Sequence, residues 1–140
     1  MHTTVFLDQE TTAISLLTTA EATGELPPRS LMLLITDRLA RLVLAIGVDD
    51  VPDDPPQNER VVALTPVLGE ISRRDDCDGA LLAVGRYGDP RPRGGDLGWH
   101  DAFAHGTAAA GVTSHGTYVV TPRGVRRVRP WLAPPGLLAV

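Results

Sequence analysis

Apolar positions follow two different spacings along the chain. In residues 9–23 and 59–74 they recur every three or four positions, which predicts amphipathic helices. Continuous apolar runs at 31–37 and 41–49, separated by a short turn, predict a β-hairpin. The run at 79–85 is apolar throughout and bounded by glycines, which favours a central strand buried on both faces.

Proline and capping residues refine these elements. Pro66 lies inside the second helix and removes a backbone hydrogen bond there, so we expect a kinked helix or one that begins near Pro66. Asp96 is a residue type that caps helices, and it predicts the start of a third helix with Trp99 and Phe103 on its buried face. Gly111 is expected to end this helix.

Two further strands are predicted at 115–121 and 124–130, joined by a short turn at 122–124. The predicted order is therefore α-ββ-α-β-α-ββ. Strands that alternate with helices imply an α/β fold, here a three-layer arrangement with a mixed sheet and helices on both faces. We expect residues 1–130 to form a single domain and 131–140 to form an apolar C-terminal tail.

The composition narrows the function classes. The 140 residues are 43% hydrophobic and 21% charged, as in an ordinary globular protein, and the formal net charge of −4 argues against a general nucleic-acid binder. Cys77 is the only cysteine, so neither an intramolecular disulfide nor a cysteine-based zinc site can form within one chain. No run reaches about 18 uninterrupted apolar residues. The N-terminus lacks a basic stretch followed by an apolar one, so we expect a cytoplasmic protein without a membrane segment.

The loop between the buried strand and the third helix carries the candidate binding chemistry. Its three arginines, close to a helix N-terminus, could hold an anion, or the loop could be a rigid proline-rich connector. Asp96 and His100 are four residues apart and could form an acid–base or metal pair on one helix face, or a cap and a surface pair; Asp101 and His105 have the same spacing. The candidate binding residues are Arg86, Tyr87, Arg91, Arg93, Asp96 and His100.

The loop composition favours a structural role for this segment. Pro90 and Pro92 fix backbone angles and reduce the entropy lost on ordering. Asp96 is then expected to accept a hydrogen bond from a backbone N–H of the first helical turn. Under this interpretation Asp96→Ala destabilises the fold, whereas Ser or Asn restores most of the stability because both residues also cap helices.

A second group of arginines lies in the C-terminal strand. Arg126 is expected on one face of this strand and Arg127 and Arg129 on the other, because side chains alternate along a strand. These arginines could contact nucleic acid, although Trp131 is the only aromatic residue close enough in sequence to support base stacking. The alternative is an edge strand that its charge protects from pairing.

From Glu70 to Val128 the chain resembles the RadC-like branch of the JAB/MPN domain family. The Gly-Asp-Pro at 88–90 matches the same motif in the family's loop, Pro92 matches the next proline, and Asp96 matches the metal-ligand aspartate. The resemblance implies a JAB/MPN-like fold. The two metal-binding histidines of the family would fall at 83–87, where this chain has AVGRY.

Other departures from the family pattern also bear on function. The position of the family's serine holds Arg93 or Gly94, and no residue clearly matches its catalytic glutamate, for which the first hairpin offers Asp49 and Asp50. A hydrolytic zinc site needs three protein ligands, and Asp96 alone cannot supply them. The resemblance therefore implies a metal-free member of the family, and such members are usually scaffolds or binders.

The N-terminal half is also similar to an uncharacterised family common in actinobacteria. The similarity lies in ISLLTTAEATGELPPRSLMLLI at 14–35 and RLVLAIGVDDVP at 41–52, and it implies no known activity.

These observations lead to one expected function and two alternatives. We expect a non-catalytic binding or assembly module without metal or cofactor, which associates with a second copy or a protein partner through the apolar tail at 131–140. One alternative is a hydrolase-like enzyme with a relocated site built from Asp96, His100, His115 and the arginines. The other is an anion or nucleic-acid binder that uses the arginine-rich loop and the C-terminal strand.

Overall fold

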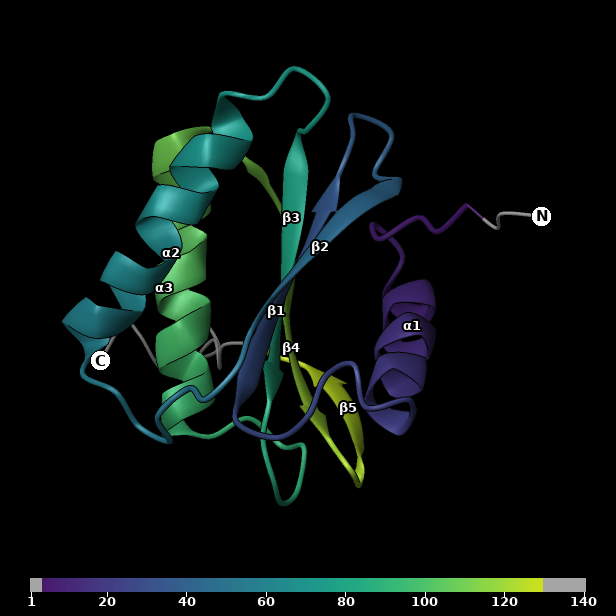
Figure 1. The fold of residues 1–140 in the computed structure, drawn as a ribbon, viewed down its shortest axis with the longest axis vertical. Helices are drawn as coiled ribbons and strands as arrows, with labels where there is room; N and C mark the ends of the chain where they lie inside the picture. Colours follow the sequence, from purple (N-terminus) through teal and green to yellow (C-terminus); the bar gives the residue numbers. More distant parts are fainter. Residues whose placement is uncertain (1–3, 130–140) are drawn as a thin grey trace, which may run out of the picture.

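A five-stranded mixed sheet between two helical layers forms the fold (Figure 1). The computed structural model describes residues 4–129. The strand order is β2-β1-β3-β4-β5, in which β3 and β4 are parallel and the other neighbours are antiparallel. The elements are α1 (Glu10–Ala22), β1 (Ser30–Thr36), β2 (Leu42–Val48), α2 (Gln57–Ser72), β3 (Gly79–Gly85), α3 (Gly94–Ala110), β4 (Thr113–Thr121) and β5 (Gly124–Arg127).

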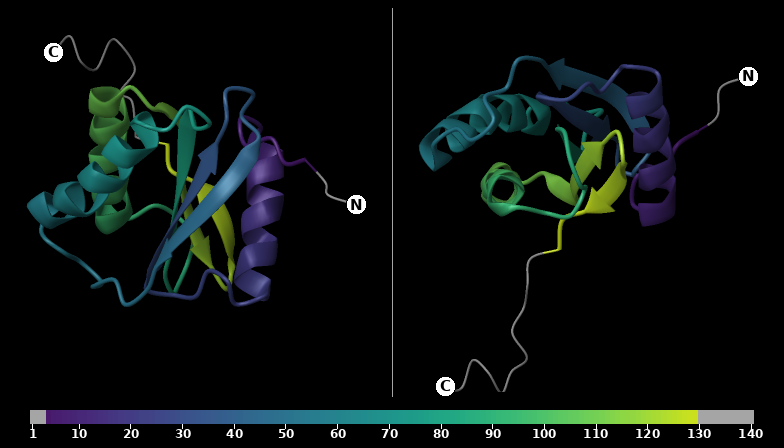
Figure 2. Two further views of the ribbon diagram at one scale, coloured as in Figure 1. Left: turned by 45° about the horizontal axis from the view of Figure 1, so that its top comes forward. Right: turned by 90° about the horizontal axis from the view of Figure 1, so that it is seen from below.

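The helices cover both faces of the sheet, which confirms the predicted α/β class and element order. α2 and α3 pack on one face and α1 packs on the other (Figures 1 and 2). β3 contributes alternate side chains to the two cores: Leu82 lies under α2 and α3 with Phe103, and Leu81 lies under α1 with Leu17 and Tyr118. Every residue of β3 is buried, so the predicted central strand at 79–85 is confirmed to the residue.

Two expectations about where the helices begin are wrong: the alternative of a helix that begins near Pro66, and Asp96 as an N-cap. α2 runs from Gln57 through Pro66, so the helix does not begin near that proline. Pro66 has no N–H to donate to the carbonyl of Val62, four residues earlier in the helix. Both residues are exposed, so water can bind that carbonyl instead. α3 begins at Gly94, which makes Asp96 its third residue rather than its N-cap; Arg93 occupies the cap position.

The two edges of the sheet differ sharply. β5 is the short edge and carries Arg126 and Arg127, so the predicted charged edge strand is confirmed. β2 is the other edge, and its seven residues, LVLAIGV, contain no charge. The segment 5–7 pairs with the start of β2 on its outer side, where the Leu7 N–H donates to Ala40 and the Leu42 N–H donates to Val5. Beyond Leu42 no other part of the described chain pairs with the outer side of β2.

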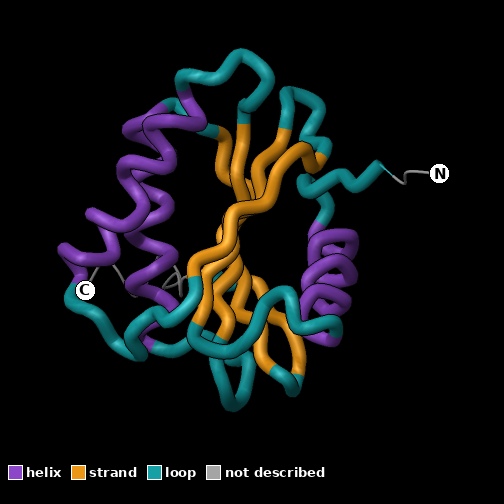
Figure 3. Tube along the Cα trace, in the orientation of Figure 1, coloured by secondary structure: helices purple, strands orange, loops and turns teal. Residues whose placement is uncertain are grey.

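The loops gather at the two ends of the sheet (Figure 3). β1 is antiparallel to β3, so β1 begins where β3 ends, with Ser30 opposite Gly85. The segments before β1, after β2 and after β3 therefore meet at one end, together with the start of α3. None of the helices within residues 4–129 is long and apolar enough to cross a membrane. The predicted C-terminal tail lies outside the described residues.

Candidate functional site

A cleft of about 400 Å³ opens where these segments meet. Arg29 comes from the start of β1, Asp53 from the segment after β2, Tyr87 and Arg93 from the loop after β3, and Trp99 from α3. Three segments far apart in sequence, at 29–30, 51–54 and 84–99, thus converge at the carboxyl end of β3. This is the end of an α/β sheet where ligands are commonly bound. Four of the six predicted binding residues line the cleft, namely Arg86, Tyr87, Arg93 and Asp96. The other lining residues were not selected from the sequence.

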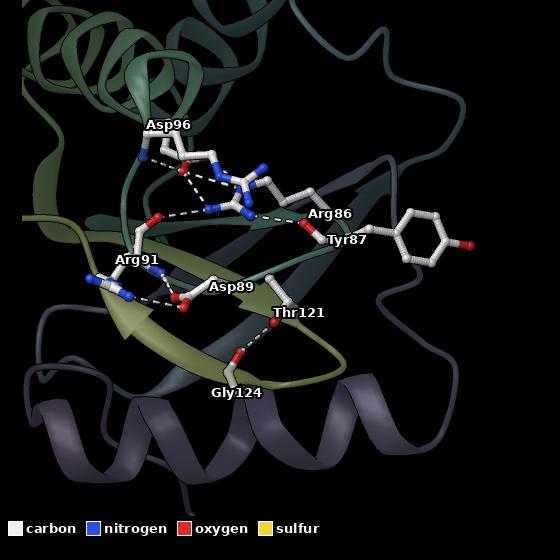
Figure 4. A network of polar contacts seen from close by, with 8 residues as sticks. Arg86, Tyr87, Asp89, Arg91, Asp96, Thr121 and Gly124 are labelled. Carbon is white, nitrogen blue, oxygen red and sulfur yellow. Dashed lines mark hydrogen bonds and ion pairs between the residues drawn. The ribbon is translucent and has the colours of Figure 1, made fainter.

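Arg86 holds the loop in place by binding both Asp96 and two backbone carbonyl groups of the loop (Figure 4). Its Nε lies 3.1 and 3.2 Å from the two carboxylate oxygens of Asp96, and its Nη2 donates to Asp96 Oδ2 at 2.9 Å. The same guanidinium donates to the carbonyl oxygens of Tyr87 and Arg91, each at 2.8 Å. Only 4% of the Asp96 side chain and 17% of the Arg86 side chain are exposed, so the ion pair is largely shielded from water.

Asp96 also ties the loop to the helix. Its Oδ2 accepts a hydrogen bond from the backbone N–H of Arg93, at 2.8 Å, which is the reciprocal half of a capping box. The carboxylate thus binds one guanidinium and one backbone N–H outside the helix. The expectation that Ser or Asn could replace Asp96 assumed that Asp96 is the N-cap, a position that Arg93 occupies. Neither Ser nor Asn carries the negative charge that pairs with Arg86, so we no longer expect either residue to substitute for Asp96.

The remaining loop residues point in different directions. The Tyr87 side chain is exposed and extends away from the ion pair (Figure 4). The Arg93 guanidinium lies over Gly88, where a Cβ would come within 2.7 Å of Nη2, and the φ of +96° at Gly88 also favours glycine. Both Tyr87 and Arg93 line the cleft.

Acidic residues close the far side of the cleft. Asp53 lies 3.5 Å from Arg29, and Asp54 lies 2.8 Å from Arg60. Arg60 is buried between α2 and α3, with its guanidinium 5.7 Å from the ring centre of Trp99. The acidic segment after β2 is therefore anchored by ion pairs to the body of the fold.

The histidines do not join Asp96. His100 Nδ1 lies 2.9 Å from the hydroxyl of Thr117, and burial lowers the pKa of His100. His105 forms an exposed contact of 3.6 Å with Asp101, as one of the two interpretations of that spacing predicted. His115 lies at the start of β4, the opposite end of the sheet from the loop, where its Nε2 is 3.0 Å from Thr36 Oγ1.

The fold brings the two groups of arginines together. Arg91, from the loop, meets Arg123 and Arg126, from the β4–β5 hairpin, around an open depression of about 500 Å³ that also contains Asp89. The N–H of Arg91 donates to the Asp89 carboxylate at 2.8 Å and is the main cause of a lowered Asp89 pKa, to which the Arg91 and Arg123 charges add.

The other arginines of the C-terminal strand face away from this depression. Arg127 lies 3.8 Å from Glu10 on α1, and Arg129 pairs with the same carboxylate. The predicted separation of Arg126 from Arg127 and Arg129 is therefore confirmed.

Sequence reasoning missed an apolar groove between β2 and α2. The groove measures about 280 Å³, and we call it the β2 groove. The apolar hairpin was evident in the sequence, but no local signal showed that β2 would be the edge strand and that α2 would leave it partly uncovered. The residues that line it are Ile35, Leu44, Ile46, Pro66, Val67, Glu70, Ile71, Arg74 and Cys77.

Within residues 4–129 no group of three or more histidine, cysteine, aspartate or glutamate side chains is placed to hold a metal ion. Comparison of the chain with protein-family models, with curated proteins and with solved structures finds no match.

Substitution of Asp96 distinguishes an ion pair from a helix cap. We expect Asp96→Ala, Asp96→Ser and Asp96→Asn each to lower the free energy of unfolding by about 3 kcal/mol, because each leaves the Arg86 guanidinium without its counter-charge in a poorly hydrated place. Chemical denaturation measures the effect. Asp101→Asn, on the exposed face of α3, is the matched control and should change stability little. Recovery of stability in the Ser and Asn variants would restore the cap interpretation.

Acidification tests the half-buried His100. Burial holds the pKa of His100 below that of an unfolded histidine, about 6.5. Below that pH the unfolded chain takes up a proton that the folded chain does not, so stability falls as the pH decreases through this window. His100→Gln should reduce the slope of stability against pH between pH 6.5 and the folded pKa. His105→Gln, on the exposed side of α3, should leave the slope unchanged; equal slopes in all three proteins would show that His100 is not protected from protonation.

Proposed function

We propose that this chain is a non-catalytic binding or assembly module and that it associates through the β2 groove. The observation that carries the proposal is the edge strand itself. Val43, Leu44 and Val48 are 49%, 39% and 50% exposed, on a strand with no charged or proline residue. Proteins usually protect such an edge, because unpaired backbone groups beside apolar side chains promote association with other chains.

The groove extends the apolar surface from the strand onto the neighbouring helix. Leu44 and Ile46 form its wall on β2, and Pro66 and Val67 form its wall on α2. The exposed Val62 lies one helical turn before Pro66, so the apolar surface continues along α2. A continuous apolar surface of this kind, between a strand and a helix, is typical of a protein interaction site.

Within this proposal the chain is a metal-free domain with a JAB/MPN-like arrangement. The element order and the place of the Gly-Asp-Pro motif between a buried strand and a helix support it. The Arg86 guanidinium contacts both oxygens of Asp96, the residue that the resemblance matches to a metal ligand. A positive side chain already neutralises that carboxylate, which supports a structural rather than a catalytic use of the loop.

An apolar dye tests whether the β2 groove is a binding surface. We expect anilinonaphthalene sulfonate to fluoresce in a dilute solution of the folded chain and to lose most of that fluorescence in Leu44→Lys, because the lysine places a charge in the groove. Leu97→Lys is the matched control, since Leu97 is about as exposed as Leu44 but lies on α3. Thermal unfolding establishes that both variants fold. Equal fluorescence in the two variants, or none in the wild-type chain, would contradict the proposal.

The convergence of arginines favours a second candidate function, the binding of an anion. Arg123 and Arg126 form no ion pair with another residue in the described range, and Arg91 shares its depression with them. A guanidinium group presents several donors in a fixed plane that fits phosphate oxygens. This candidate uses a surface separate from the β2 groove.

Pyrophosphate titration tests the anion site. We expect calorimetry to detect binding that weakens as the salt concentration rises, and Arg126→Gln to weaken it several-fold. Arg38→Gln removes the same charge from an exposed position at the other end of the sheet and should leave binding unchanged. If pyrophosphate does not bind at low salt, or binds both variants equally, the depression is not an anion site.

A further inference from the structure

The charges at the two ends of β2 have opposite signs. Arg38 and Arg41 precede the strand, Asp49 and Asp50 follow it, and all four residues are exposed. Arg41 already pairs with Asp37 at 2.7 Å, so Arg38 supplies the net positive charge of the first end. No charged residue lies between Leu42 and Val48. A strand with this distribution is complementary to a copy of itself that runs antiparallel, because the basic end of each copy then lies beside the acidic end of the other.

The open part of the edge is also symmetric. Pairing with the segment 5–7 covers the edge up to Leu42. After Val48 the chain leaves the edge, since Asp50 has a φ of +58° and the Val51 N–H donates to Arg29. On the outer side of β2, therefore, no residue within 4–129 pairs with residues 43–47, and Ala45 lies at the centre of this stretch.

We propose that a second copy of this chain occupies the β2 groove, with the two β2 strands paired antiparallel about a two-fold axis at Ala45. The proposal rests on the binding function proposed above and names its partner. In this register each Ala45 faces the other, and Leu44 of one copy faces Ile46 of its partner. Residues directly opposite each other in an antiparallel pair project from the same face of the sheet, so both copies keep α2 and α3 on the same side.

This pairing joins the two sheets into one and closes the assembly. Leu44 and Ile46 of both copies come together beside the two grooves and bury apolar surface that each copy alone leaves in water. The edges that remain are the two β5 strands, which are four residues long and carry Arg126 and Arg127. A two-fold interface uses the same surface of both chains, so it is complete in a dimer. The β5 edges are short and charged, which disfavours pairing with further copies.

Charge placed on the axis tests the pairing and its register. The wild-type chain should sediment with the mass of two chains at high concentration and of one chain on dilution. Ala45 is exposed, so a longer side chain fits there in the single copy. Ala45→Lys and Ala45→Glu each bring two like charges together and should raise the dissociation constant about tenfold or more. An equimolar mixture of the two variants brings opposite charges together and should restore the two-chain mass.

Controls separate this proposal from the general binding function. Ala104→Lys and Ala104→Glu, on the exposed face of α3, should associate as the wild type does. Circular dichroism establishes that all four variants fold, and hydrogen exchange of the wild-type β2 amides, which should slow as concentration rises, tests the pairing without any substitution. If the wild-type chain sediments with the mass of one chain at every concentration, the dimer proposal is wrong. Dye binding in the β2 groove would in that case still support the binding function proposed above. Two-chain mass unaffected by either Ala45 variant, or not restored by their mixture, would overturn this interface.

Discussion

Burial of β3 on both faces is the constraint on which the rest of the arrangement depends. Leu81 and Leu82 are fully buried on opposite faces, so each face needs its own helical layer. With β3 at the centre, β1 and β4 become its neighbours and β2 and β5 become the edges. α2 packs toward the centre of the sheet and leaves the groove beside β2 uncovered. The candidate interaction surface is therefore a consequence of how the core is filled.

The elements that local sequence signals could predict are those that depend on near neighbours. The run at 79–85 is apolar at every position, and the glycine at Gly111 adopts the left-handed conformation, with φ +72°, that ends a helix. Pro66 left the start of this helix undecided, because the effect of a proline depends on which side of α2 faces water. That side is decided by the packing of Leu64 and Leu68 against the sheet, which spacing alone does not reveal.

The candidate site depended on contacts between distant residues. Arg86 and Asp96 are ten residues apart, and their pairing exists only because the loop folds back from β3 onto the start of α3. Asp96 could be recognised as important for the helix start, but its charge partner could not. Similarly, Arg91 and Arg126 share one depression because the loop lies against the β4–β5 hairpin, where a Cβ at Gly124 would lie 3.5 Å from Pro90. Strand order, rather than composition, decided which predicted residues meet.

The position of β3 in the middle of the sheet also bears on how the chain folds during synthesis. β1 and β2 are joined by a short turn and can pair as soon as both have been made, but β1 pairs on its other side with β3, which follows only after α2. Until residues 79–85 emerge, the backbone groups of β1 that face β3 have no strand beside them, and Leu33 and Ile35 lack the side chains that cover them. The order of synthesis thus leaves a nascent hairpin with an apolar edge on both sides, and the arrival of the central strand removes one of them.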